Sequence, residues 1–163
     1  MDGAEEYTVD MLLEEILKYK SYFGENGGVT VSGGEPLLQI EFVIELFKRL
    51  KEYHIHTACD TSGITFQPSN SKNVELHERL LEVTDLVLLD IKHIDPLEHK
   101  RLTGFDNENI LAFARFLSIH NQPMWIRHVI IPTITLNEVY LKKLKKFIDS
   151  LNTVENLVPS GRV

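Results

Sequence analysis

Gly27-Gly28-Val29-Thr30-Val31-Ser32-Gly33-Gly34-Glu35-Pro36-Leu37-Leu38-Gln39 is the stretch of this 163-residue sequence that decides the fold. A short β-branched run ends on two glycines and a carboxylate, and a helical pattern follows. Successive glycines let the backbone bend sharply and leave its N–H and C=O groups free to bind a ligand. Glu35 adds a negative charge that can hold an ammonium group. The junction therefore suits an amino-acid-like zwitterion, although the same residues also form ordinary tight turns between a strand and a helix.

Outward from this junction, short apolar runs alternate with helical patterns. The runs predict four strands at residues 29–32, 55–59, 86–91 and 125–131. The run at 85–91 is almost continuously apolar, as expected of a strand covered on both faces. Helices are predicted after an N-cap at Thr8 and at residues 43–50, 76–83, 96–102, 110–117 and 136–151, with a loop at 66–73. The alternation predicts the α/β class, with a parallel sheet and helices outside it.

Composition and charge limit the function classes. The length suits a single domain over residues 1–163, and the net charge of −7 argues against a nucleic-acid partner. No apolar run is long enough for a membrane span, and the acidic start does not resemble a signal peptide. The one cysteine, Cys59, cannot form an internal disulfide and suits the cytoplasm. It also cannot build a zinc or iron–sulfur site alone, and we interpret it as a buried structural thiol.

Charged residues gather where the predicted strands end. Ligands of parallel α/β sheets bind beyond the carboxyl ends of the strands. Those ends carry three carboxylates, one lysine and one arginine, in the segments Gly33-Gly34-Glu35, Asp60-Thr61, Asp90-Ile91-Lys92 and at Arg127. A ligand with its own ammonium and carboxylate would need such a set. The alternative is that Asp85, Asp90 and Lys92 only end a strand in solvent.

Four motifs in one register resemble the pyruvate formate-lyase activating enzymes, which are radical S-adenosylmethionine (SAM) enzymes. The motifs are Val29–Glu35, Ile55-His56-Thr57 with Asp60-Thr61, Thr84–Lys92 and Trp125–Val129, and the similarity runs from about residue 8 to about residue 156. The resemblance implies a partial (β/α)6 TIM-like barrel. It also implies a reaction in which a reduced [4Fe–4S] cluster cleaves SAM, and the resulting radical takes hydrogen from a glycine of pyruvate formate-lyase. Flavodoxin or ferredoxin would supply the electron.

The resemblance also implies roles for individual residues. Gly33, Gly34 and Glu35 would hold the methionyl amino group of SAM, with Asp60 beside it. Asp90-Ile91-Lys92 would meet the methionyl portion, with the lysine on its carboxylate. Other implied sites are a monovalent cation held by Asp60, Thr61 and Asp90, and a contact of Arg127 with the polypeptide loop that carries the target glycine.

The sequence departs from the family at its two ends. The family holds its cluster with a Cys-x3-Cys-x2-Cys motif, whereas this sequence offers no iron–sulfur ligands, and residues 157–163 match nothing in the family. We therefore expect a truncated radical SAM barrel over 1–163. The alternative function is a catalytically inactive SAM-binding or partner-binding fragment. A sugar-phosphate enzyme would need a phosphate-binding glycine loop after the last strand, which the sequence does not contain.

Overall fold

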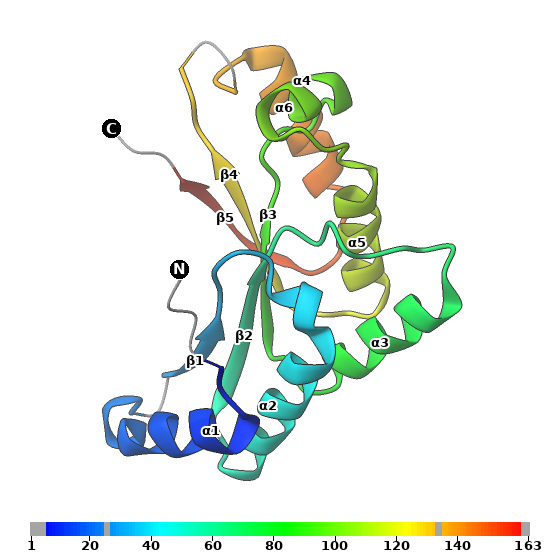
Figure 1. Ribbon diagram of the computed structural model, residues 1–163. Coiled ribbons are helices and arrows are strands. Elements are labelled where there is room, and N and C mark those ends of the chain that lie inside the picture. The colour runs from blue at the N-terminus through cyan, green and yellow to red at the C-terminus, as the bar shows by residue number, and fades with distance from the viewer. Residues whose placement is uncertain (1–5, 25–26, 133–134, 161–163) are drawn as a thin grey trace.

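The computed structural model describes residues 6–24, 27–132 and 135–160, and its centre is a sheet of five parallel strands (Figure 1). In chain order these are β1 (Gly28–Val31), β2 (His56–Thr61), β3 (Leu86–Asp90), β4 (Met124–Val129) and β5 (Val154–Ser160). Each strand pairs in parallel with the next one along the chain. The predicted α/β class, the parallel sheet and the sequential order of the four predicted strands are confirmed.

The prediction of only four strands is wrong, because β5 pairs with β4 along its length. The sequence of β5 contains Glu155, Asn156 and Pro159, which interrupt the apolar pattern that reveals a buried strand. Such residues are tolerated because β5 lies at the edge of the sheet, where one side of the backbone needs no partner. The pairing is also irregular, with a register shift between Met124 and Trp125.

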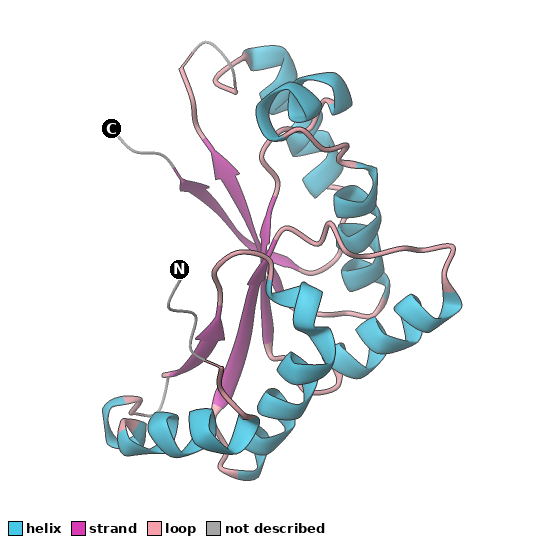
Figure 2. Cartoon of the chain, viewed as in Figure 1, coloured by secondary structure: helices cyan, strands magenta, loops and turns pink. Residues whose placement is uncertain are grey.

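Helices connect the strands and pack against one face of the sheet (Figure 2). The described residues form α1 (Val9–Lys18), α2 (Ile40–Glu52), α3 (Ser71–Leu81), α4 (Pro96–Thr103), α5 (Glu108–Ile119) and α6 (Glu138–Ile148), with short 3-10 helices η1 (Lys20–Tyr22) and η2 (Pro36–Gln39). Thr8 caps α1 as predicted, because its hydroxyl accepts a hydrogen bond from the backbone N–H of Met11 at 3.2 Å.

One helix begins earlier than its sequence pattern indicates. Residues 66–73 were predicted as a loop, but α3 already begins at Ser71. The polar residues that suggest a loop include an N-cap, since the side chain of Asn70 accepts from the N–H of Asn73 at 3.3 Å. Phe66, in the same segment, is only 2% exposed and belongs to the core.

The two faces of the sheet have different surroundings. In β3, Val87 and Leu89 are fully buried beneath the helices, whereas Leu86 and Leu88 are half-buried on the opposite, inner face. The expectation that β3 is covered on both faces is therefore wrong for the described residues. A hollow of about 580 Å³ lies on the inner face, lined among others by Thr30, Ala58, Leu88 and Trp125. The indole N–H of Trp125 donates to the carboxylate of Glu155 at 3.3 Å.

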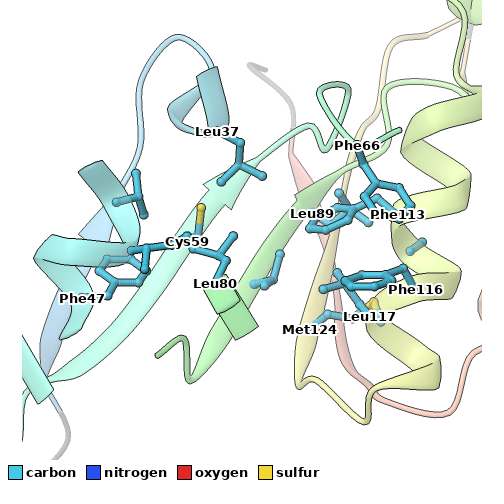
Figure 3. Packing of buried hydrophobic residues seen from close by; sticks show 14 of the residues in the cluster. Leu37, Phe47, Cys59, Phe66, Leu80, Leu89, Phe113, Phe116, Leu117 and Met124 are labelled. Atoms are coloured by element: carbon cyan, nitrogen blue, oxygen red, sulfur yellow. The ribbon is translucent and has the colours of Figure 1, made fainter. Parts of the chain in front are cut away.

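Apolar side chains fill the space between the outer face of the sheet and the helices (Figure 3). Residues without solvent exposure come from α2, β2, α3, β3, α5 and β4, among them Phe47, Leu80, Leu89, Phe113 and Leu117. Burying one such side chain stabilises the fold by roughly 1.5–3 kcal/mol. Because every second side chain of a strand is packed in this core, the side chains between them point to the inner face of the sheet.

One buried histidine belongs to an aromatic cluster in this core. His77 is 1% exposed and lies edge-on to Phe66 and Phe113, with ring centroids at 5.0 and 5.4 Å. Its Nδ1 lies 2.7 Å from the carbonyl oxygen of Asn73, while Nε2 has no hydrogen-bond partner among the described atoms. Burial lowers the pKa of His77 below its ordinary value of 6.5 and outweighs the Asn73 hydrogen bond, which raises it.

We predict that the free energy of unfolding decreases as pH falls below 6.5, the ordinary pKa of this side chain. The unfolded chain then binds a proton that the folded chain excludes from His77. The free energy of unfolding therefore falls by up to about 1.4 kcal/mol for each pH unit. Urea denaturation between pH 7.5 and 5.5 measures the effect. His77→Phe should flatten the pH dependence, whereas the control His54→Asn, at an exposed position, should not. Equal slopes for wild type and His77→Phe would contradict this account.

Candidate functional site

The turn after β1 has the conformation that its two glycines predict. Gly33 and Gly34 have φ angles of +93° and +53°, in the left-handed region that side chains disfavour. A Cβ added at either position would meet no atom within 4 Å, so the glycines serve the backbone conformation and not a tight contact. Both residues are exposed. The turn is therefore open to solvent just beyond the end of β1.

Glu35 links this turn to the end of β2. Its carboxylate caps η2 by accepting from the N–H of Leu37 at 3.1 Å. The same carboxylate accepts from the hydroxyl of Thr61 at 2.5 Å, and from the N–H and hydroxyl of Ser62 at 3.0 and 2.5 Å. Ser62 was not among the predicted site residues, although a hydroxyl residue directly after a strand was a usable signal.

Asp60 and Arg127 form an ion pair on the inner face. Arg127 Nη1 contacts Asp60 Oδ2, and their side chains are 33% and 23% exposed. The pair crosses β3, because Asp60 is level with Leu88 whereas Arg127 is level with Asp90. The two residues that were predicted to contact different ligands are thus bonded to each other.

Asp90, Ile91 and Lys92 lie where β3 ends. Lys92 Nζ lies 2.5 Å from Asp90 Oδ2, while Asp90 Oδ1 is buried and has no hydrogen-bond partner among the described atoms. Ile91 is fully buried; its N–H donates to the carbonyl of Arg127 at 2.9 Å, and its own carbonyl lies 2.6 Å from Nδ1 of His128. Ile91 therefore sets the spacing of Asp90 and Lys92. His128 was not among the predicted site residues, and its pKa is lowered by burial.

The predicted monovalent cation site remains a prediction. Asp60 and Thr61 are neighbours in β2, so their side chains point to opposite faces of the sheet. Thr61 as a residue is only 3% exposed, and its hydroxyl donates to Glu35. Any contact of Thr61 with an inner-face ligand would therefore use its carbonyl oxygen. Within the described segments, no group of three His, Cys, Asp or Glu side chains could hold a metal ion.

The interpretation of Cys59 as a buried thiol is confirmed. Its side chain has no solvent exposure and lies on the core side of β2 (Figure 3). Burial raises the pKa of Cys59 to about 12, and the charges of Glu35 and Asp60 add to the effect. Both the burial and the raised pKa agree with a structural thiol in the core. No membrane-spanning helix occurs within the described residues, because none is sufficiently long and apolar.

Comparison with known proteins gives consistent matches. The sequence model of the Radical SAM superfamily matches residues 1–144. A Staphylococcus epidermidis protein named pyruvate formate-lyase-activating enzyme is 52% identical over 155 residues, which cover 94% of this chain and 61% of that protein. The Streptococcus mutans protein of the same name is 47% identical over 154 residues, covering 94% and 58%. The chain thus spans less than two thirds of the length of these relatives.

A solved structure supports the fold. The crystal structure of a domain of pyruvate-formate lyase-activating enzyme from Bacteroides vulgatus superposes with a TM-score of 0.70 at 33% identity. The match covers 83% of this chain and 81% of that domain. The predicted partial-barrel fold is therefore confirmed by this similarity.

We predict that Gly34→Ala destabilises the fold by about 1–2 kcal/mol, because an L-residue with a side chain is strained at a left-handed φ. Gly34→Asn should cost less, since asparagine tolerates that region better than most residues. Chemical denaturation of the three proteins measures the difference. Equal stability of Gly34→Ala and wild type would show that the turn does not hold its positive φ of +53°.

Proposed function

Because this chain belongs to the radical SAM superfamily, we propose that it serves in an activating enzyme that uses SAM to install a glycyl radical in pyruvate formate-lyase. The observation that carries the proposal is the 52% identity over 155 residues to an enzyme of that name. The rim of the sheet supports it, because a glycine turn and an Asp-x-Lys strand end lie on the same edge.

The residues at this rim fit SAM. The methionyl end of SAM carries an ammonium and a carboxylate. Lys92 offers a cation for the carboxylate, and the unpartnered Oδ1 of Asp90 is an acceptor suited to an ammonium N–H. The open peptide groups at Gly33 and Gly34 add neutral hydrogen-bonding groups. SAM bound here would supply, once one electron cleaves it to methionine and a 5′-deoxyadenosyl radical, the radical that removes a hydrogen atom from the glycine of the partner enzyme.

The residues of this chain do not fit the [4Fe–4S] cluster of the family. Such a cluster needs several thiolates, and the sequence contains one cysteine, which is buried in the core. We propose that the cluster ligands come from residues outside this sequence. The same proposal has three further parts. Arg127 contacts the target polypeptide, flavodoxin or ferredoxin donates the electron, and the enzyme acts in the cytoplasm.

The second candidate is a SAM-binding or partner-binding protein without catalytic activity. The burial of Cys59 favours it for the chain taken alone. The two candidates differ in the iron content of a protein extended with the cluster motif: after reconstitution with iron and sulfide, an activating enzyme binds the cluster and an inactive protein does not.

We predict that the chain alone, reconstituted anaerobically with iron, sulfide and reductant, shows no cluster absorbance and forms no 5′-deoxyadenosine from SAM. Extension with the Cys-x3-Cys-x2-Cys segment and the closing βα unit that the family resemblance implies should give both. Cys59→Ala in the extended protein should not change either result, because Cys59 lies in the core. Product formed by the unextended chain would refute the assignment of the ligands to outside residues.

We also predict that SAM binding to the chain alone is weaker than micromolar and depends on Lys92. Removing one charge-assisted hydrogen bond with Lys92→Met should weaken binding by about tenfold or more. Isothermal titration with SAM measures both constants. The control is Lys72→Met, which removes an exposed lysine of α3 that is not one of the rim residues. Submicromolar affinity, or equal effects of the two substitutions, would contradict the proposed site.

A further inference from the structure

The carboxylate of Glu35 has no free acceptor position. A carboxylate offers about four lone-pair sites, two on each oxygen. Oε1 accepts from the N–H of Leu37 at 3.1 Å and from the hydroxyl of Thr61 at 2.5 Å. Oε2 accepts from the N–H of Ser62 at 3.0 Å and from its hydroxyl at 2.5 Å. All four donors belong to this chain, so a ligand ammonium would have to displace one of them.

The donors are themselves held in place. Thr61 is 3% exposed, and its hydroxyl oxygen also accepts from the N–H of Gly63 at 2.9 Å. The hydroxyl oxygen of Ser62 lies 3.4 Å from the N–H of Ile64. Three of the four hydrogen bonds to Glu35 therefore come from one rigid strand end, 26 or 27 residues further along the chain.

The glycine turn lacks other means of support. Added Cβ atoms at Gly33 and Gly34 would meet no neighbour within 4 Å, so no packed atoms confine the turn on those sides. Glycine also has more backbone freedom than any other residue, which makes an unsupported turn of two glycines mobile. Glu35 follows the turn directly, and its four hydrogen bonds fix the point at which the turn ends.

We propose that Glu35, Thr61 and Ser62 form a positioning network that holds the Gly33–Gly34 turn in its binding conformation. Glu35 acts through the turn and does not contact the ligand ammonium. The turn presents its peptide groups to an α-amino-acid moiety, which in the proposed function is the methionyl end of SAM. The SAM-binding part of this proposal therefore rests on that function. Thr61 thereby has a different role from the cation contact that the family resemblance implies.

The test uses three disrupting substitutions, Glu35→Gln, Thr61→Val and Ser62→Ala, in the 163-residue chain. Thr61→Ser and Ser62→Thr keep the hydroxyl groups and serve as conservative variants. Glu45→Gln removes an exposed charge of α2 and is the matched control for charge. The first readout, without ligand, is the ¹⁵N backbone order parameter of Gly33 and Gly34. The second readout is the dissociation constant of SAM from an NMR titration.

We expect each disrupting substitution to lower the order parameters of the turn and to weaken SAM binding by about tenfold, the fold-change of one hydrogen bond to a charged group. Effects within one network are not additive, so Glu35→Gln combined with Ser62→Ala should weaken binding no more than the stronger single change. The conservative variants and Glu45→Gln should resemble wild type in both readouts.

Two results would overturn the inference. If Glu35→Gln weakens binding while Thr61→Val and Ser62→Ala leave it unchanged or tighter, Glu35 contacts the ligand directly. If the order parameters stay unchanged in all three variants, the network does not position the turn. Failure of wild type to bind SAM would refute the proposed SAM site instead, and the order parameters would still decide whether Glu35 positions the turn.

Discussion

Parallel hydrogen bonding between neighbouring strands is the constraint on which the site depends. Because all five strands run in one direction, their carboxyl ends reach the same edge of the sheet. The register then decides which side chains meet. Asp90 and Arg127 are level, and Asp60 is one inner-face position behind them on the far side of β3, which allows a long arginine to reach it. A shift of one residue would move these side chains to the core face.

The candidate residues form pairs of opposite charge and not a cluster of free charges. Arg127 is bonded to Asp60 and Lys92 to Asp90, so this part of the rim has no net charge although the whole chain carries −7. A zwitterion, which is also neutral overall, can bind there without leaving an unbalanced buried charge. The Oδ1 of Asp90, which has no partner among the described atoms, is the one buried acceptor of these two pairs left without a hydrogen bond.

The sequence predicted those features that depend on composition along one segment. The strand at 86–91 was evident from its apolar run, and the Gly-Gly-Glu turn and the burial of Cys59 followed from local residue types. What it could not reveal depends on partners distant in the chain. The charge of Glu35 suggested a ligand contact, whereas its hydrogen bonds to Thr61 and Ser62 exist only because β1 and β2 are neighbours. β5 was missed for the same reason, since an edge strand is defined by its pairing with β4 more than by its own polar sequence.

The inner face of the sheet also contains a natural fluorescent probe. Trp125 is the only tryptophan of the sequence, and it lines the hollow on that face with its indole N–H directed to Glu155. Indole emission shifts to shorter wavelength when water around the ring is replaced by protein. The fluorescence of the unlabelled protein therefore reports whether the hollow is open to solvent or covered.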